Sequence, residues 1–456
     1  MNTQVQSSAQ TTASFYKTAA SIGVPVMISS LISIGLNMVD TLMIGRLGVL
    51  ELSGVGAANR ITFIAQVMCF GFYAGITIFL SQYWGIKDIK NIHRTLGIGY
   101  VSGFILCSLF TLAAVLFARP LMSLFSDDGA VIGYAVDYLH IVCFTYPLSA
   151  FSFLIIFACR SVHRPMIPTV CNATALLLNT FFNYCLIFGK FGFPAWGVKG
   201  AAVATLGSRV VELLLLLAYV YLFSKDHPIA ARFSGMFPIQ LPYLKTIFRT
   251  ALPSLANEAI WSVGTSVYYI AFGMVNNSAI AVVQVAGVVN DFFVAIFYGV
   301  GNASMVMIGN ELGRNRTQLA FQYGKSFIRI GLICCLFSTA ALFFSRNLIA
   351  GIYNFDPFTN RQLLETLLVY ALFTTPRMMG YVVAIGILRA GGDTRFCLLC
   401  DVAGIWCLGV PLSFLGAVVL HLPLCWVVAL CFAEEVFKLA FFVHRFHSKR
   451  WINVFV

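Results

Sequence analysis

Charged residues are scarce in this sequence, and their scarcity argues against a soluble protein. Only 10% of the 456 residues are Asp, Glu, Lys or Arg, whereas water-soluble chains carry about 25%. Hydrophobic residues make up 59% of the chain, and its mean hydropathy is +0.87. We therefore expect a protein whose solvent is the lipid bilayer, and not a soluble enzyme.

Histidine is also rare, and the cysteines do not form a recognisable site. Of the 7 His residues, only His140 lies well inside an apolar run, so the converging clusters of a membrane enzyme are missing. The 13 Cys residues lie mostly in apolar runs and are interpreted as small core residues. Cys397 and Cys400 form a CxxC, but neither a second pair nor a placed His completes a zinc site. We expect no enzyme activity, no metal and no cofactor.

Acidic residues are outnumbered, with 17 Asp and Glu against 29 Lys and Arg, which gives a net charge of +12. In a soluble chain this excess would indicate nucleic-acid binding. Here the basic residues lie mostly between apolar runs and are interpreted as topology signals. Most fall in the loops on the N-terminal side, among them Lys87, Lys225, Arg249, Arg389 and Lys438. Both termini are therefore expected in the cytoplasm, and no nucleic-acid partner is expected.

Twelve apolar runs are long enough to cross a bilayer as helices. The N-terminal segment is polar and lacks the basic-then-apolar build of a signal peptide, so the first run is expected to remain as a span. The expected spans cover residues 16–45, 53–83, 96–117, 131–157, 166–188, 197–223, 247–273, 280–308, 324–345, 364–388, 395–418 and 421–444.

The second half of the chain resembles the first. Pro25 and Pro253, and Gly71 and Gly299, match at an offset of 228 residues. Gly45 with Gly273 and Gly85 with Gly313 keep this register, and Pro147 with Pro376 and Arg160 with Arg389 continue it at 229. Because six spans is an even number, the two halves have parallel topology, related by an axis along the membrane normal. The expected division is a polar tail (1–15), a six-helix bundle (16–224), a cytoplasmic linker (225–246), a second six-helix bundle (247–445) and a cytoplasmic tail (446–456).

Asp40 is the first ionisable residue that the membrane would have to bury. Placing a charge at the bilayer centre costs at least about 2.5 to 3.5 kcal/mol, so a carboxylate there is expected to have a specific function or partner. Asn37 lies one turn earlier on the same helix face, and Pro25 frees a backbone carbonyl and can bend the helix. We interpret Asp40 as a residue that takes up and releases a proton. The alternative is a structural Asp that is paired with a neighbouring helix.

Glu258 is the corresponding candidate in the second half, five residues after Pro253. The repeat has not copied Asp40, whose counterpart is Tyr268, so the halves differ in chemistry. Glu258 is either a second coupling residue or a side chain that extends to water at the cytoplasmic end of its helix.

Other embedded polar groups leave alternatives open. Asn179 and Asn183 share a helix face and either offer carbonyl oxygens to a cation or join helices, and Thr205 could join either arrangement. Asp401 is either a coupling residue or a structural Asp. Asp137, Asp291 and the pair Arg209 and Glu212 are interpreted as structural.

Five motifs, taken together, resemble the multidrug and toxic compound extrusion (MATE) family. They are VDTLMIGRLG at 39–48, SQYWG at 81–85, LNTFFNY at 178–184, PAWGVKGAAVAT at 194–205 and GILRAGGDTRF at 386–396. The resemblance covers nearly the whole chain. It implies an all-α integral membrane protein, with twelve transmembrane helices in two six-helix bundles arranged as a V.

The resemblance also implies site residues. The family's first-helix acid falls on Asp40, and its polar cluster falls on Asn179, Asn183 and Thr205, with Tyr138 nearby. Asp40, Asn37 and Tyr138 are then expected at the substrate cavity. Some members have Asp at the position of Asn183, so this chain has one carboxylate where they have two. That difference favours coupling to protons, with sodium as the other possibility.

Glu258 matches the helix-seven acid of the NorM-type branch of the family. That branch also has a helix-ten Asp four residues after a Tyr. Here Tyr370 is followed at that spacing by Thr374, so Asp401 or another group would have to substitute.

The resemblance implies export of bulky organic, often cationic, compounds in exchange for protons or sodium, by a transporter that alternates between two open states. A monomer in the bacterial inner membrane is expected. The alternative function is a flippase for lipid-linked oligosaccharide or related polyisoprenoid cargo. Its cavity should be cationic to meet a pyrophosphate, whereas the embedded groups here are mainly carboxylates.

Overall fold

The computed structural model describes residues 2–125, 128–224, 227–237, 240–276, 278–352 and 355–455, and it describes only the backbone of residues 2–13, 49, 233, 234 and 352. Within these ranges the chain forms helices joined by short turns, with no strand. Lys225, which was counted as a cytoplasmic charge, lies outside the described residues. So do three more positions of the expected linker: 226, 238 and 239.

The chain divides into two compact units. Residues Ile28–Ala251 form one, called here the N-terminal unit, and Met1–Met27 with Leu252–Val456 form the other, called the C-terminal unit. Both boundaries fall inside long helices, next to Pro25 and Pro253, the two prolines that the repeat relates. Each unit therefore includes the beginning of one helix whose remainder belongs to the other unit.

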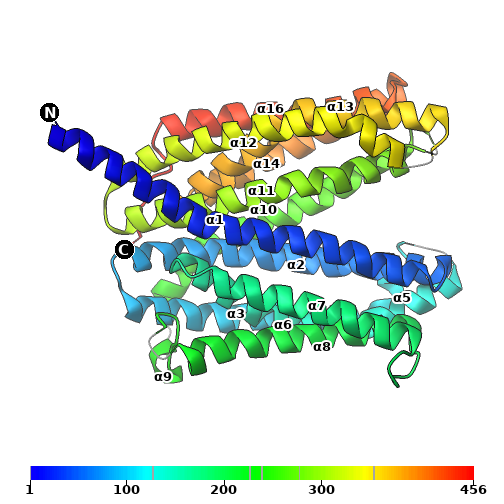
Figure 1. The fold of residues 1–456 in the computed structure, drawn as a ribbon, viewed down its shortest axis with the longest axis horizontal. Coiled ribbons are helices and arrows are strands. Elements are labelled where there is room, and N and C mark those ends of the chain that lie inside the picture. Colours follow the sequence, from blue (N-terminus) through cyan, green and yellow to red (C-terminus); the bar gives the residue numbers. More distant parts are fainter. Residues whose placement is uncertain are drawn as a thin grey trace. The chain divides into compact units, whose positions relative to one another are not determined.

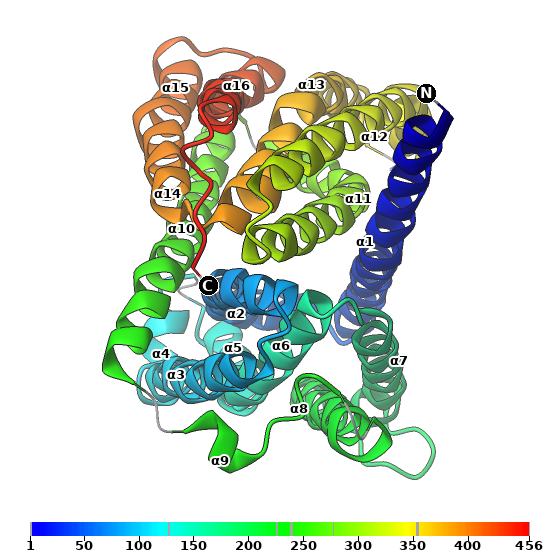
Figure 2. The same cartoon turned by 90° about the vertical axis from the view of Figure 1, so that its left-hand side faces the viewer.

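The N-terminal unit is a bundle of helices that run side by side (Figure 2). Asp128 caps one of them, α5, by accepting hydrogen bonds from the backbone amides of Ala130 and Val131. The short π-helical turn η1 (Tyr219–Phe223) ends another, α8. The helices of this unit are the second part of α1 (Asn2–Gly45), α2 (Val49–Gly85), α3 (Ile89–Leu116), α4 (Ala118–Met122), α5 (Gly129–Val142), α6 (Thr145–Ser161), α7 (Met166–Phe188), α8 (Gly197–Ala218), α9 (Phe233–Met236) and the first part of α10 (Leu241–Gly273).

The C-terminal unit contains two long spans that change helix type along their length. Its α-helices are α11 (Ala279–Gly313), α12 (Thr317–Ile352), α13 (Pro357–Tyr381), α14 (Thr394–Val402), α15 (Val410–Phe414) and α16 (Leu424–His447). The π-helical segments η2 (Val382–Leu388), η4 (Ala403–Gly409) and η5 (Leu415–Val419) and the 3-10 turn η3 (Arg389–Gly391) join them. The start of α1 and the end of the chain lie at the same end of this unit (Figure 1). That placement fits an even number of spans.

Ten of the twelve expected spans pass a simple test of length and hydropathy. Among the described residues, nine helices are long and apolar enough to cross a membrane, and the bent pair α5 and α6, which meet at 48°, makes a tenth. The other two expected spans are α10, with 33 residues, and α16, with 24. Both are long enough but carry polar side chains, including Glu258 on α10 and Lys438 on α16. These side chains must find partners inside the protein.

The first segment of the chain is helical. α1 begins at Asn2 and passes through Pro25 without interruption, so helix extends through the residues expected as a polar tail. The beginning of α1 packs in the C-terminal unit, where Phe15 meets Phe327 with ring centroids 5.1 Å apart.

Each unit has a close helix contact at the beginning of α1 or α10 that only small residues allow. In the C-terminal unit, a Cβ on Gly299 would lie 2.5 Å from the Gly23 carbonyl oxygen. In the N-terminal unit, a Cβ on Gly75 would lie 2.5 Å from Ala251 Cα. Position 251 is the repeat counterpart of Gly23. Only residues without bulk allow the backbones to approach this closely, so the glycines fix how the beginnings of α1 and α10 pack.

Candidate functional site

Asp40 lies in a polar cluster between α1, α7 and α8 of the N-terminal unit. Its Oδ1 accepts a hydrogen bond from Thr180 Oγ1 at 3.3 Å. The Asn179 amide, turned so that both its polar atoms are paired, donates to Asp40 Oδ2 at 2.7 Å and accepts from the Thr205 backbone N–H at 3.2 Å. None of the ion pairs formed by described residues includes Asp40. Its negative charge is therefore stabilised by neutral donors alone.

Asn183 completes this cluster and leaves one acceptor unused. Its Nδ2 lies 3.4 Å from the side-chain amide of Asn179. The side chain is buried, with 2% exposed, and its Oδ1 has no hydrogen-bond partner among the described residues. The Tyr138 hydroxyl interacts with Thr205. A buried acceptor without a donor is costly, so the cluster has capacity for one more proton or cation.

The structure brings together Asp40, Asn179, Asn183, Thr205 and Tyr138, as the sequence predicted. Asn37, expected on the same helix face, is exposed, and its backbone carbonyl accepts a hydrogen bond from Thr41. Thr180 was not anticipated from the sequence.

Glu258 has a buried basic partner. Its Oε1 accepts from Arg389 Nη1 at 2.9 Å, and Arg389 also contacts Asn257 Oδ1. Glu258 is 9% exposed and Arg389 is 1% exposed. The alternative in which Glu258 extends to water is therefore wrong.

Lys438 connects this pair to three more carboxylates. Its Nζ lies 3.4 Å from Asp401 Oδ1 and 3.1 Å from Glu435 Oε1. Glu434 Oε2 is 3.7 Å away. Asn257 Nδ2 donates to Asp401 Oδ2 at 2.6 Å and so links the Lys438 cluster to the Arg389 pair. Together these residues form a connected network, called here the C-terminal charge network: Asn257, Glu258, Arg389, Asp401, Glu434, Glu435 and Lys438.

Two basic residues were therefore misplaced by sequence reasoning. Arg389 and Lys438 were counted as cytoplasmic loop charges, but both are buried, with 1% and 3% exposed. Arg389 was misplaced because it follows a π-helical segment, and its 3-10 turn aims it back into the unit. Glu434 and Glu435 were missed, although the run AEEVFK inside the last apolar segment is a visible signal.

A pocket of about 550 Å³ lies beside this network. Its walls include the rings of Tyr268, Tyr269, Phe272, Tyr370 and Phe432. Asp291 and Arg377 also line it, and Arg377 lies over the Phe432 ring at 4.3 Å and donates to Asn290 at 3.4 Å. The pocket thus offers aromatic faces and one charge of each sign.

The other candidates have separate surroundings. Tyr370 lines the pocket, and Thr374 donates to the Tyr370 carbonyl oxygen at 2.8 Å within α13. Neither takes part in the hydrogen bonds around Glu258, whereas Asp401 is linked to Glu258 through Asn257 and Arg389. In the N-terminal unit, Arg209 and Glu212 neutralise one another at 2.7 Å, as expected from their spacing, and half-exposed Asp137 lies 3.3 Å from Lys199.

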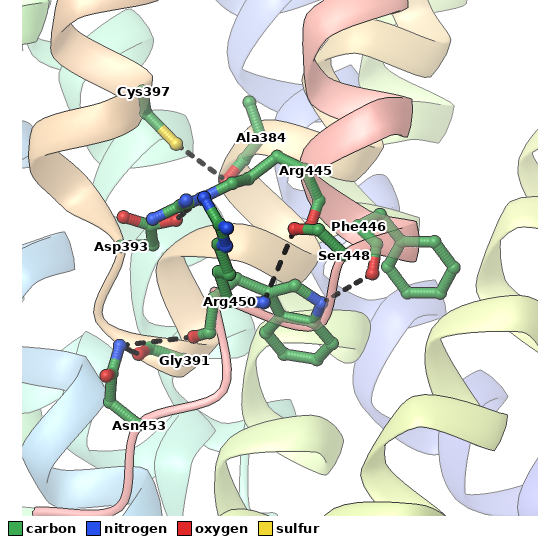
Figure 3. Close-up of polar contacts among 10 residues, drawn as sticks. Ala384, Gly391, Asp393, Cys397, Arg445, Phe446, Ser448, Arg450 and Asn453 are labelled. Atoms are coloured by element: carbon green, nitrogen blue, oxygen red, sulfur yellow. Dashed lines mark hydrogen bonds and ion pairs between the residues drawn. The ribbon is translucent and has the colours of Figure 1, made fainter.

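The turn that carries Arg389 is held by the C-terminal tail (Figure 3). Asn453 donates to the Gly391 carbonyl oxygen at 2.8 Å, and Arg445 pairs with Asp393 at 2.6 Å. Trp451 is fully buried, and its backbone carbonyl group and ring together occupy the space where a Cβ on Gly391 would lie. The tail therefore fixes the backbone from which Arg389 reaches Glu258.

Comparison with known proteins gives a consistent assignment. The family model MatE matches residues 25–185 and again residues 253–415. The two matches begin at Pro25 and Pro253, which are related by the 228-residue offset of the repeat.

Individual relatives agree with this match. The chain is 25% identical over 405 residues to a protein named probable multidrug resistance protein NorM of Listeria monocytogenes serotype 4b, covering 88% of this chain and 87% of the relative. It is 25% identical over 406 residues to multidrug resistance protein MdtK of Pectobacterium atrosepticum, covering 87% of each. Its fold matches a crystal structure of MATE in complex with MaL6 with a TM-score of 0.86 at 16% identity, covering 95% of this chain and 97% of that one. With both halves matched by the family model, a twelve-helix fold and full-length relatives, the chain belongs to the MATE family of multi-pass membrane transporters.

Proposed function

We propose that this transporter exports bulky organic compounds, chiefly cations, in exchange for protons, with Asp40 as the coupling residue. The names of its relatives, NorM and MdtK, support multidrug export. The observation that carries the proposal is the position of Asp40. Its carboxylate is half-buried within a span, is held by Thr180 and Asn179, and forms no ion pair with a described residue.

Protonation of Asp40 would change its hydrogen bonds. Binding of a proton can therefore change the conformation of the transporter. A charged carboxylate accepts from Thr180 and Asn179, whereas a protonated one also has a proton to donate. Asn183 Oδ1, which has no hydrogen-bond partner among the described residues, is an acceptor for that proton within the same cluster. Proton and substrate must favour different states, or compete for one charge, because a ligand with equal affinity for both states shifts nothing.

Protons are favoured over sodium because the cluster holds one carboxylate. Asn183 contributes a neutral oxygen at the position where some members of the family have an acid. A monovalent metal ion would depend on Asp40 for all of its charge compensation, whereas a proton needs only one carboxylate oxygen. The cytoplasmic location of both termini and an inner-membrane location are part of this proposal.

Aromatic walls suit flat organic substrates. The rings of Tyr268, Tyr370 and Phe432 in the C-terminal pocket can stack on such compounds, and cation–π contact favours positive ones. Asp291 adds a negative charge to the same pocket. Asp40 and Tyr138 remain the proposed substrate contacts of the N-terminal unit.

The flippase alternative is less well supported. A pyrophosphate-bearing lipid needs unpaired basic groups. The two most deeply buried Lys and Arg side chains among the described residues, Arg389 and Lys438, are already paired with carboxylates.

The test is export of a fluorescent organic cation from proteoliposomes under separately imposed proton and sodium gradients. A proton gradient should drive export by the wild type, and Asp40→Asn should abolish it. Asp137→Asn, which changes a half-exposed carboxylate in the same unit, should transport as the wild type does. Export driven by sodium alone, or normal export by Asp40→Asn, would contradict the proposal.

A further inference from the structure

The C-terminal charge network holds more acidic than basic groups. Its basic members are Arg389 and Lys438, and its acidic members are Glu258, Asp401, Glu434 and Glu435. If all were ionised, two negative charges would lack a basic partner. Uncompensated charge is costly inside a protein in a membrane, so the network favours binding of a positive species.

Glu434 is the least satisfied of the four acids. Glu258 is paired with Arg389 at 2.9 Å, and Asp401 accepts from Asn257 at 2.6 Å. Glu435 lies 3.1 Å from Lys438 and is partly exposed. Glu434 is 4% exposed, and its Oε2 lies 3.7 Å from Lys438 with no hydrogen-bond donor among the described residues.

A second unsatisfied group points at Glu434. Tyr268 is 6% exposed, and its hydroxyl interacts with the Glu434 carboxyl group without meeting any described residue at normal hydrogen-bond geometry. The Tyr268 hydroxyl and the Glu434 carboxyl group both lie next to Gly409. A Cβ on Gly409 would overlap the hydroxyl and would lie 3.2 Å from Glu434 Cδ. Gly404 leaves room for the Lys438 side chain, whose Cγ and Cδ would lie 2.8 Å from a Cβ at that position, and for Glu434 Oε2, which would lie 3.2 Å from it. Two glycines thus make space for an acid and a hydroxyl that face one another.

Tyr268 also belongs to the wall of the C-terminal pocket. Its repeat counterpart is Asp40, the coupling residue proposed in the N-terminal unit. Tyr268 is therefore placed between the pocket and the otherwise enclosed Glu434.

We propose that Glu434 is a second proton-binding residue of this transporter, loaded from the C-terminal pocket through the Tyr268 hydroxyl. The proposal extends the proton coupling proposed for Asp40 and rests on it for its role in transport. In the loading step the Tyr268 hydroxyl passes its proton to the Glu434 carboxylate and accepts one from a hydronium ion in the pocket. Tyrosine ends neutral, glutamate becomes a neutral acid, and the reverse step releases the proton.

The surroundings favour a proton over a metal ion. Lys438 Nζ lies 3.1 to 3.7 Å from both α16 glutamates, and its charge would repel a metal cation at that position. The titratable and charged groups that face Glu434 are Tyr268 from α10, Asp401 from α14, and Glu435 and Lys438 from α16 itself. One turn earlier on α16, the Cys431 thiol interacts electrostatically with the Arg377 guanidinium of α13.

Infrared difference spectroscopy of the purified, lipid-reconstituted full chain tests proton binding directly. Spectra taken between acidic and alkaline buffer should contain C=O bands of protonated carboxyl groups. Glu434→Gln should lose one component that Asp40→Asn retains. Glu435→Gln, which changes the adjacent acid, and Glu365→Gln, which changes a partly exposed acid of the same unit, should both retain it. An unchanged spectrum in Glu434→Gln, or loss of the same component in Glu435→Gln, would overturn the assignment.

Tyr268→Phe tests the route. It removes one oxygen and leaves the ring, so the Glu434 band should persist but appear more slowly after a pH jump. An unchanged rate would overturn the relay.

Transport stoichiometry tests the role in coupling. The number of protons exchanged per substrate, measured from the gradients at which flux reverses, should fall by one in Glu434→Gln relative to the wild type. An unchanged stoichiometry would overturn the coupling role. If the wild type transports without any proton gradient, the proposed function fails, and the infrared comparison still decides whether Glu434 binds a proton.

Discussion

Arg389 donates to Glu258 at 2.9 Å across 131 residues of sequence, and both side chains are buried. The pair joins the turn that begins at Arg389 to the middle of α10. Asn257, next to Glu258, extends the connection to Asp401 and so to Lys438 on α16. The two expected spans that did not pass the test of length and hydropathy, α10 and α16, are therefore held together by their polar groups.

Removal of Arg389 should destabilise the transporter strongly. Arg389→Gln leaves Glu258 buried without its ionic partner, and breaking a buried pair in this way costs about 3 to 5 kcal/mol. Thermal unfolding in detergent should show the loss. The double variant Arg389→Gln with Glu258→Gln should recover part of it, because the unpaired charge is gone.

The matched control is an exposed pair of the same unit. Arg361 lies 2.9 Å from Glu365, with its side chain 81% exposed. Arg361→Gln should change stability by at most about 1 kcal/mol, as exposed pairs do. Equal losses in Arg361→Gln and Arg389→Gln would show that the buried position of Arg389 does not matter.

The C-terminal tail should support the Arg389 turn. Trp451 is fully buried, stacks on Phe446 with centroids 5.9 Å apart, and donates from Nε1 to the Phe446 carbonyl oxygen. Trp451→Ala should cost about 3 to 5 kcal/mol, as for other buried aromatic truncations. Val454→Ala, at an exposed position of the same tail, should have little effect. Unfolding in detergent measures both, and an unchanged Trp451→Ala would contradict the packing role.

Asn183→Asp should make the N-terminal cluster responsive to sodium. The change places a second carboxylate beside Asp40, where Thr205 and Asn179 supply further oxygens. Two acids with neutral oxygen ligands compensate a cation better than one acid does. The measurement is the shift of thermal unfolding with sodium chloride against choline chloride. Asn172→Asp, on the same helix near Ser29, is the control, and an equal response in both variants would mean that the cluster has no special affinity.

His227 should make the segment between the two repeats sensitive to acid. Burial, with a further contribution from Arg164, lowers the pKa of His227 from its ordinary value of 6.5 to about 4. The unfolded segment therefore binds more protons between those values, so stability is complete above pH 6.5 and falls as the pH is lowered toward 4. The loss should be about 3 kcal/mol.

His227→Gln should flatten this dependence, because glutamine does not titrate. Limited proteolysis of the segment at a series of pH values is the measurement. The same acid sensitivity in His227→Gln as in the wild type would assign the effect to another group.

The sequence alone determined the membrane class, the span positions and the repeat. Hydrophobic runs of bilayer length and glycines and prolines in fixed register are local or regularly spaced patterns, so they can be read without coordinates. It also predicted the cluster around Asp40, because Asn179 and Asn183 lie one helical turn apart and the motifs resemble those of a known family.

Only the tertiary structure decided which buried charges meet. Arg389 and Lys438 were read as loop charges because position in sequence does not reveal which way a π-helical or 3-10 segment turns a side chain. Glu258 and Arg389 are 131 residues apart, and Tyr268 faces Glu434 only because Gly409 leaves space between helices. Such contacts depend on how distant helices pack, because the energy of a buried charge is set by the groups that surround it in space.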